Sequence, residues 1–405
     1  MPVIQSILKE VLAEIVPHDT VLKEAQAFVE GINLAAKKKK IKATAVLGGS
    51  FAKDTYITGD YDVDVFVKFH PSYEDDKLSE LLFELLKEHT PARIHGSRDY
   101  FQIKNKILFE VVPVREIKEA ADARNVTDFS PYHVAWVKKA KLSNEIRLSK
   151  KFCKAQGVYG AESYKQGFSG HVLDIITIYY GGFLKLIKQA AKWKPKVVID
   201  PKNKYKGRAL QILNKSKIQG PLVVIDPTQP DRNAAAALNL ENFEKFISVA
   251  QKFIKKPTLK FFEERNINAE LQKKKGTLLV IDITPADAPE NVAGAKINKV
   301  KEFLTAKLKD FDVKEAIWEW QNERIKMYFV VKNNTLPAEY THQGPPVQKT
   351  QHVEMFKKQY KKTWIENNRI FAKAQRKFTR IIEALNAACN ETYVKERTKK
   401  CTVQT

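Results

Sequence analysis

Cysteine is scarce in this sequence, and long apolar segments are missing from it. The 405 residues include three cysteines, Cys153, Cys389 and Cys401, whose spacing fits neither a metal site nor a disulfide framework. No apolar run reaches the length of about 18 residues that a membrane span needs. The N-terminal residues Met1 to Val3 do not begin a charged and then apolar export signal. These absences predict a soluble, cytoplasmic protein that is neither secreted nor embedded in a membrane.

Acidic residues are also few relative to basic ones. The chain has 70 Lys and Arg residues against 47 Asp and Glu residues, which gives a formal net charge of +23. Such a surface attracts polyanions, of which nucleic acid is the commonest. Because lysine outnumbers arginine, neutralisation of a phosphate backbone is favoured over bidentate reading of bases. No basic amphipathic segment with a continuous apolar face is evident, which disfavours membrane binding.

Two short motifs near the N-terminus have the residue types of a nucleotide-transfer site. Thr44 to Leu47 predicts a buried strand that ends in the turn Gly48-Gly49-Ser50, where backbone N–H groups and a hydroxyl can approach phosphates. The following strand alternates so that Asp62 and Asp64 lie on one face. Paired carboxylates repel each other unless a divalent cation neutralises them, which suits Mg²⁺ carrying a nucleoside triphosphate. The alternative is an ordinary turn followed by two solvated carboxylates.

A third acid interrupts an otherwise apolar strand. The stretch from Ile107 to Val114 contains Glu110 among apolar residues, and an isolated buried charge is costly without a partner. Glu110 is therefore predicted to join Asp62 and Asp64 as a catalytic residue and metal ligand. An edge strand that exposes Glu110 to water is the alternative.

These three acids and the Gly49-Ser50 turn resemble the catalytic motif of the DNA polymerase beta nucleotidyltransferase superfamily. Further segments resemble the archaeal (class I) CCA-adding enzymes, the tRNA nucleotidyltransferases: Arg147 to Lys150, Gly157 to Glu162, Gly167 to Gly170, Asp226-Pro227, Asp231 to Ala236 and His342 to Val347. The resemblance covers nearly the whole chain. Two positions depart from the family pattern, which has glutamate in place of Asp62 and aspartate in place of Glu110.

The resemblance implies addition of CCA to the 3′ end of immature or damaged tRNA, with CTP and ATP as substrates and pyrophosphate as product. Two Mg²⁺ ions would be held by Asp62, Asp64 and Glu110. The remaining nucleotide-binding residues would be Gly49, Ser50, His133, Lys150 and Tyr159 at the triphosphate, with Arg232 and Asp226 at the base. His133 could instead cap a helix, and Lys151 or Lys154 could take the place of Lys150. Other open readings are a poly(A) polymerase, an oligoadenylate synthetase, or an RNA-binding protein whose catalytic site has decayed.

The apolar pattern predicts an α+β protein of several domains. A mixed α/β nucleotidyltransferase head is expected over residues 1–131 and a helical neck over 132–256. A body with βαββ order is expected over 257–335 with 366–405, and a tail over 336–365.

Several elements are predicted individually. One helix should begin after a cap at Asp19, one should run from Tyr132 to Gln156, and one should start at Arg232. Hairpins are expected about Gln321-Asn322 and about Asn367-Asn368. Residues 336–346 are expected to form a loop, and the chain after Asn390 is expected to fray.

Lysines in the tail are the predicted distal contact with RNA. They surround a basic helix and comprise Lys349, Lys357, Lys358, Lys361 and Lys362. A catalytic head at the N-terminus requires another part of the chain to hold an elongated RNA. These lysines are expected to contact the phosphates of the tRNA acceptor stem and T arm. Partners are therefore tRNA, CTP and ATP, and not a membrane; a homodimer is left open.

Overall fold

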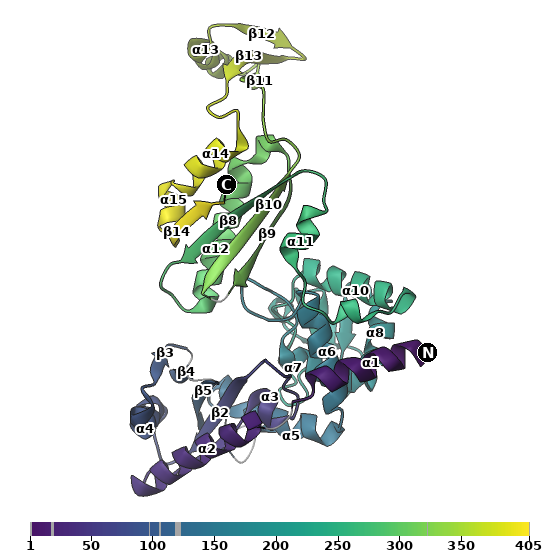
Figure 1. Cartoon of the computed structure of the whole chain (residues 1–405), viewed down its shortest axis with the longest axis vertical. Helices are drawn as coiled ribbons and strands as arrows, with labels where there is room; N and C mark the ends of the chain where they lie inside the picture. The colour runs from purple at the N-terminus through teal and green to yellow at the C-terminus, as the bar shows by residue number, and fades with distance from the viewer. Residues whose placement is uncertain are drawn as a thin grey trace. The chain divides into compact units, whose positions relative to one another are not determined.

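The computed structural model describes residues 2–17, 20–96, 98–104, 107–117, 123–321 and 323–404. It consists of two compact units, Met1–Arg265 and Asn266–Thr405 (Figure 1). The predicted α+β architecture with several domains is confirmed. None of the described helices is both long and apolar enough to cross a membrane.

The first unit contains a mixed five-stranded sheet. Its strands are β1 (Ala43–Leu47), β2 (Asp62–Phe69), β3 (Ala92–Ile94), β4 (Tyr100–Lys104) and β5 (Leu108–Arg115), in the order β1-β2-β5-β4-β3. Strands β2 and β5 are parallel, and the other pairs are antiparallel. Because side chains alternate along a strand, the fully buried Val63, Val65 and Val67 of β2 share one side of the sheet.

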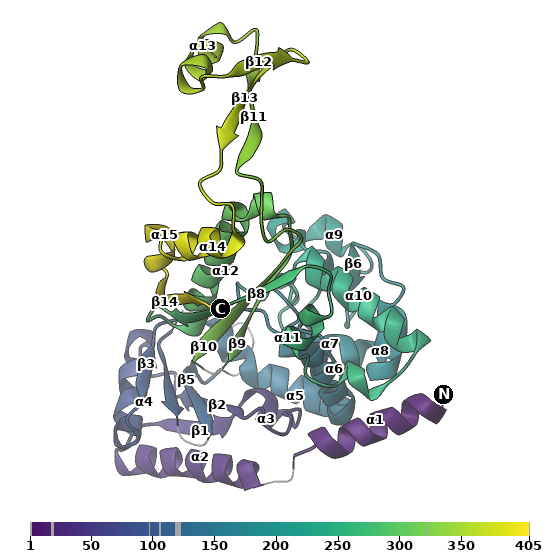
Figure 2. The same ribbon diagram turned by 45° about the horizontal axis from the view of Figure 1, so that its top comes forward.

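Two helices cover that apolar side. Helix α2 (Thr20–Lys38) runs along β1 (Figure 2), and α4 (Leu78–Leu86) packs into the same core. Asp62, Asp64 and Glu110 alternate with the core residues, so they project from the opposite side. The short helix α3 (Gly49–Ala52) follows β1 directly. Asp19, predicted as the cap of α2, lies outside the described residues.

The remainder of the first unit is mainly helical. Its helices are α1 (Pro2–Ile15), α5 (Ser130–Ala140), α6 (Ser143–Ala155), α7 (Gly170–Tyr180), α8 (Phe183–Ala190), α9 (Ala209–Ile212) and α10 (Leu240–Lys255). A parallel pair of strands, β6 (Val197–Ile199) and β7 (Leu222–Val224), accompanies them. The core is rich in phenylalanines that contact one another edge to face, including Phe152, Phe183 and Phe253.

Two predicted neck helices differ from the structure. A single helix from Tyr132 to Gln156 is wrong, because Lys141 adopts a left-handed backbone with φ of 54° that separates α5 from α6. A helix beginning at Arg232 is also wrong. Helix α10 begins at Leu240, where the Asn239 side chain accepts a hydrogen bond from the backbone N–H of Asn242. Arg232 lies in an irregular segment before this helix.

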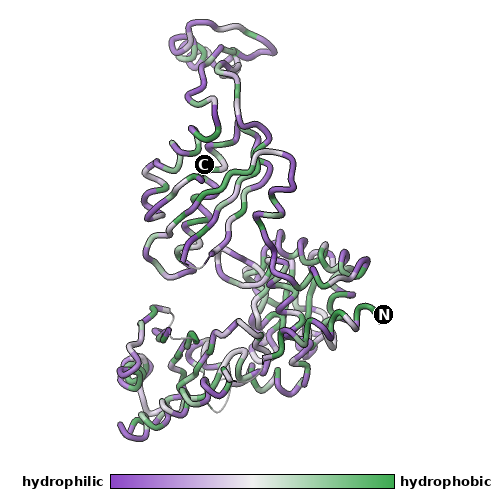
Figure 3. The backbone as a smooth tube through the Cα atoms, viewed as in Figure 1, coloured by the Kyte–Doolittle hydropathy of each residue, from purple (hydrophilic) through white to green (hydrophobic). Residues whose placement is uncertain are grey.

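The second unit has a four-stranded antiparallel sheet in the order β14-β8-β10-β9. The predicted βαββ order is confirmed by β8 (Thr277–Pro285), α12 (Glu290–Lys307), β9 (Val313–Gln321) and β10 (Arg324–Val331). Asn322 of the predicted hairpin lies outside the described residues. Apolar residues, green in Figure 3, concentrate in the central strands. Helix α11 (Ile267–Gln272) precedes β8, and α14 (Ile381–Cys389) packs on the same core as α12.

The end of the chain is ordered rather than frayed. Helix α15 (Thr392–Lys395) leads into β14 (Thr398–Val403), which pairs with β8 as an edge strand. Lys399 and Lys400 are exposed, whereas the two ends of the strand are buried. The fraying prediction was wrong because a polar edge strand gains its hydrogen bonds from a distant partner.

A smaller sheet of the second unit combines the predicted tail, residues 336–365, with β13 (Arg369–Gln375), which follows it in the chain. Strands β11 (Glu339–Pro346), β13 and β12 (Thr363–Glu366) pair in that order, and α13 (Thr350–Gln359) packs on one face. The predicted loop over 336–346 is therefore wrong for residues 339–346, which form β11. The hairpin about Asn367-Asn368 is confirmed, with positive φ values of 46° and 61°.

Candidate active site

Two of the three predicted acids, Asp64 and Glu110, lie in one row across the head sheet, and Asp62 lies two residues before Asp64 on the same side of β2. Asp64 on β2 is the direct neighbour of Glu110 on β5, which is in turn opposite Gln102 on β4. At the other end of the row the backbone N–H of Gly48 donates to the carbonyl of Asp64 at 2.7 Å. Strand β5 is thus an interior strand, and the edge-strand alternative for Glu110 is excluded.

The glycine turn lies directly against the Asp64 carboxylate. Gly49 has a positive φ of 46°, and a Cβ at this position would lie 1.7 Å from Asp64 Oδ2. Glycine is therefore required here for both backbone conformation and space. This close approach brings the backbone after β1 to the acids, as the sequence predicts.

Crowding of negative charge makes the row electrostatically unfavourable when no cation is bound. Burial, together with the neighbouring Glu110 and Asp62, raises the pKa of Asp64 from 3.8 to about 6. Burial and Asp62 also raise the pKa of Glu110, against the effect of its hydrogen bond from Gln102. Three oxygen ligands that repel one another fit a hard divalent cation.

A buried network connects the head to helices α6 and α7. Lys150 Nζ donates to Thr55 Oγ1 at 2.8 Å and lies 3.8 Å from Asp174 Oδ1. Lys53 Nζ donates to Asp174 Oδ2 at 2.8 Å. Burial lowers the pKa of Lys150. Both ammonium groups act electrostatically on Asp64, so positive charge surrounds the space beside the acids.

Tyr159 and Lys150 converge on the start of α7. A Cβ at Gly170 would lie 3.0 Å from Tyr159 Oη and 3.9 Å from Lys150 Nζ. Burial raises the pKa of Tyr159, which keeps its hydroxyl neutral and able to donate a hydrogen bond. Lys154 instead pairs with Asp60 and lies over the Tyr159 ring, 4.6 Å from its centroid. Of these two lysines, Lys150 is therefore the one that lies in the buried network with Thr55 and Asp174.

A second polar cluster centres on the buried carboxylate of Asp226. Its Oδ2 atom lies 3.2 Å from His133 Nε2, 3.0 Å from His171 Nε2 and 3.2 Å from Arg232 Nη1. Burial opposes ionisation of Asp226, but the two adjacent histidines hold the pKa of its carboxyl well below its usual range. Burial lowers the pKa of His171. His133 lies inside α5 rather than at its cap, where Phe129 stands.

The residue types of this cluster could also hold a metal ion. One ligand atom from each of His133, His171 and Asp226 lies within 4.8 Å of the others. The Arg232 guanidinium already supplies a positive charge at the same Asp226 oxygen. Asp226 Oδ1 accepts from Thr228 Oγ1 at 2.8 Å. Arg232, Thr228 and His171 thus have hydrogen bonds to Asp226, whereas His133 Nε2 and His171 Nδ1 are buried without a hydrogen-bond partner among the described residues.

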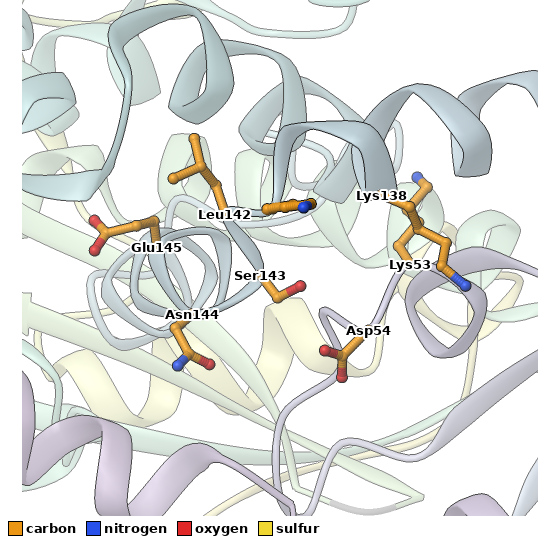
Figure 4. A pocket seen from close by; sticks show the side chains of 8 residues that line it. Lys53, Asp54, Lys138, Leu142, Ser143, Asn144 and Glu145 are labelled. Atoms are coloured by element: carbon orange, nitrogen blue, oxygen red, sulfur yellow. The ribbon is translucent and has the colours of Figure 1, made fainter.

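A basic cavity of about 530 Å³ adjoins Lys53. In Figure 4 the side chains of Lys53 and Lys138 lie on one side of it, near Asp54, with Ser143 and Asn144 opposite. The Arg147 guanidinium donates to Asp54 and, at 2.9 Å, to Asn144 Oδ1. This cavity lies between the segment after α3 and the start of α6, and Lys53 belongs both to it and to the Asp174 network.

Four polar residues of the site were not predicted: Lys53, Gln102, His171 and Asp174. Asp174 interrupts the apolar sequence of α7, the same feature that identified Glu110. Lys53 follows Ser50 by about one helical turn, which could have suggested it. Gln102 depends on strand register and His171 on tertiary packing, so the sequence contains no comparable indication of either.

The tail lysines are all exposed in the second unit. Lys349 precedes α13, Lys357 and Lys358 lie in its last turn, and Lys361 and Lys362 follow it. Among the described residues no acidic partner lies within ion-pair distance of these five ammonium groups. They are therefore accessible to an anionic partner.

Three family models match successive parts of the chain. "Nucleotidyltransferase domain" matches residues 29–147, "tRNA nucleotidyltransferase, second domain" matches 144–263, and "CCA-adding enzyme, C-terminal domain" matches 279–398. A CCA-adding enzyme of Nanoarchaeum equitans is 32% identical over 342 residues, which is 82% of this chain and 84% of that protein. A CCA-adding enzyme of Methanosarcina barkeri is also 32% identical, over 86% of this chain and 80% of that protein.

Solved structures with the same fold include the Cid1 poly(U) polymerase bound to MgATP. It has a TM-score of 0.52 and 14% identity, and the match covers 64% of this chain and 98% of that one. A cytoplasmic RNA terminal U-transferase has a TM-score of 0.51, covering 66% of this chain and 100% of that one. Fold and head motif thus define a nucleotidyltransferase. The similarity to these relatives and to the CCA-adding enzyme domain identifies the family within this class. The chain belongs to the family of CCA-adding enzymes, which are tRNA nucleotidyltransferases.

Proposed function

We propose that this protein adds CCA to the 3′ end of tRNA, using CTP and ATP and releasing pyrophosphate. The observation that supports it most is the row formed by Asp64 and Glu110 beside the Gly49 turn. Membership in the CCA-adding family makes tRNA the expected acceptor. The cytoplasm, where immature tRNA is processed, is the expected compartment.

Asp62, Asp64 and Glu110 are the residues that would hold two divalent cations, which we take to be Mg²⁺. Bound there, the ions would supply charge neutralisation at the triphosphate and would favour ionisation of the acceptor's 3′-hydroxyl for in-line attack on the α-phosphate. The protein's own contribution is positioning. Gly49 and Ser50 would approach the phosphates with backbone and hydroxyl donors, and further donors would come from Lys150 on α6 and from Tyr159 in the segment between α6 and α7.

Arg232 and His133 form the part of the site that we assign to the nucleotide's base and phosphates. Asp226 holds both groups in place from within the protein, because its buried Oδ2 accepts a hydrogen bond from Arg232 Nη1 and lies 3.2 Å from His133 Nε2. A guanidinium can donate to acceptors on both cytosine and adenine. A pocket in which the guanidinium contacts the base would accept C and A. It would disfavour a base that presents a hydrogen-bond donor to the guanidinium.

A tRNA that lacks its last three nucleotides distinguishes CCA addition from other tailing reactions. With CTP alone two residues should be added, and with CTP plus ATP three should be added before the reaction stops. The products are resolved at single-nucleotide length by gel electrophoresis. The poly(U) polymerase shares this fold, so UTP alone is the informative control. A growing tail of U or A would contradict CCA addition.

We also propose that the tail lysines contact the distal part of the acceptor stem and the T arm. All five are exposed on α13 or beside it. Lysine neutralises phosphates without reading base sequence, and duplex RNA is recognised mainly through its shape and backbone.

Replacing Lys357, Lys358 and Lys361 by glutamine should weaken tRNA binding and flatten its dependence on salt. Each lost phosphate contact should reduce the slope of log K against log salt by about 0.7–0.9. Filter binding at several salt concentrations measures this. The matched control replaces Lys202, Lys204 and Lys215, which are also exposed and lie in the first unit. Equal losses on full tRNA and on a short acceptor minihelix would show that the tail is not the distal contact.

A further inference from the structure

Gln102 makes a direct hydrogen bond to one of the proposed metal ligands. Its Nε2 atom donates to Glu110 Oε1 at 2.7 Å. The two residues are direct cross-strand neighbours on β4 and β5, on the side of the sheet that carries Asp64. Both side chains are half-buried, so water competes less for this contact than it would at the surface.

The donor leaves the rest of the Glu110 carboxylate available. A carboxylate accepts through both oxygens, and Gln102 occupies Oε1 from the side of β4. Asp64 lies on the other side of Glu110, on the neighbouring strand β2. Gln102 thus restrains the carboxylate on one side, while Oε2 can turn toward the space shared with Asp64.

Glutamate needs this restraint more than aspartate would. Its side chain has one more rotatable bond, and ordering such a chain costs conformational entropy. A neighbour that fixes a ligand before the metal arrives reduces this cost at binding. Hydrogen-bonding partners of metal ligands typically change metal affinity by about 10- to 100-fold.

We propose that Gln102 is a positioning residue that orients the Glu110 carboxylate for divalent-cation binding. This proposal rests on the proposed role of Glu110 as a metal ligand. In this role Gln102 would act through Glu110 rather than by contact with the ion or the nucleotide. Its role follows from the register that pairs β4 with β5 and from the 2.7 Å contact.

The chain offers a closely matched control pair. In the smaller sheet of the second unit, Gln375 Nε2 donates to Glu339 Oε1 at 2.9 Å, and the two residues are opposite each other on β13 and β11. Both are exposed and lie outside the proposed metal site. Replacement of Gln375 removes the same kind of hydrogen bond, from an amide to a glutamate, as replacement of Gln102 does. It should leave metal binding unchanged.

Binding of Mn²⁺ alone, followed by electron paramagnetic resonance, tests the proposal without any nucleotidyl transfer. Q102M keeps the side-chain length and removes the donor, and Q102L serves as a second variant if Q102M melts early. Each is expected to raise the Mn²⁺ dissociation constant about 10-fold, whereas Q375M should match the wild type. Wild-type Mn²⁺ affinity in a folded Q102M or Q102L protein would overturn the role of Gln102.

Two further variants separate this proposal from the proposed function. If D64N also leaves Mn²⁺ binding unchanged, the metal site itself is wrong; if only D64N weakens binding, the error concerns Gln102 alone. In E110D the shorter side chain should no longer reach Gln102, so the effect of Q102M should be smaller in that background than in the wild type. Strictly additive effects of Q102M and E110D on the Mn²⁺ dissociation constant would contradict positioning through Glu110.

Discussion

Asp64→Asn should abolish incorporation of both CMP and AMP. Asp64 lies between the Gly49 turn and Glu110, so any cation held by the acids would depend on it. Loss of one charged ligand should lower the rate at least about 1000-fold, which corresponds to about 4 kcal/mol of transition-state stabilisation. Single-nucleotide incorporation into tRNA that ends before the first C, and into tRNA that ends before the final A, measures both steps.

Binding of tRNA should survive this substitution, because lysines elsewhere supply the attraction for phosphates. The binding assay therefore serves as the control for correct folding. A variant that kept full C addition and lost only A addition would show that the two nucleotides do not share one set of metal ligands.

The same variant should be more stable than the wild type when metal is removed. The pKa of Asp64 rises from 3.8 to about 6 on folding, so the folded state binds more protons than the unfolded state between these values. Stability of the wild type therefore falls as pH rises from about 4 to about 6, and it stays low above that range. The amide that replaces the carboxylate has no charge and avoids this cost, which partial exposure limits to about 1–2 kcal/mol.

Thermal melting in EDTA measures this difference. The melting temperature of Asp64→Asn should exceed that of the wild type at a pH of about 7.5, and the gap should close toward a pH of about 4. Addition of Mg²⁺ should raise the wild-type melting temperature more than that of the variant. A gap that is absent in EDTA at neutral pH would show that burial and the neighbouring carboxylates do not destabilise the ionised form of Asp64.

The acids were predictable from sequence because their signature is local. Asp62 and Asp64 alternate with buried valines, and Glu110 interrupts an apolar strand; each pattern is complete within a few residues. The parallel pairing of β2 with β5, which brings Glu110 to Asp64, is not local. The proximity of Glu110 to Asp64 could be expected only from the chemistry of metal binding, because neighbouring carboxylates are stabilised when they share a cation.

The errors concern features fixed by distant parts of the chain. Strand β14 is polar and gains its partner from β8, which lies far earlier in the sequence. Residues 339–346 contain Gly and two prolines, yet pair with β13. Arg232 is held outside any helix, where it meets the carboxylate of Asp226. In each case a tertiary contact outweighs the local preference.

Gly49→Ala should nearly eliminate activity by displacing Asp64. The new Cβ would lie 1.7 Å from Oδ2 and 2.6 Å from Cγ of Asp64, and the φ of 46° is itself unfavourable for alanine. Either the turn or the carboxylate must move, and a displacement of about 1 Å at a reacting site can cost about 100-fold in rate. We therefore expect a fall of at least about 100-fold in kcat for both nucleotides.

Gly59→Ala separates this collision from simple backbone strain. Gly59 also has a positive φ, of 82°, and lies in the segment that connects α3 to β2, but a Cβ there would meet no atom within 4 Å. Both variants should lose about 1 kcal/mol of stability through the positive φ, and Gly49→Ala should lose more because its Cβ also collides with Asp64. Denaturant unfolding measures both losses. Only Gly49→Ala should lose catalysis. Equal activity in the two variants would mean that the glycine turn tolerates a side chain, and that the close approach of Gly49 to Asp64 is not what positions the carboxylate for reaction.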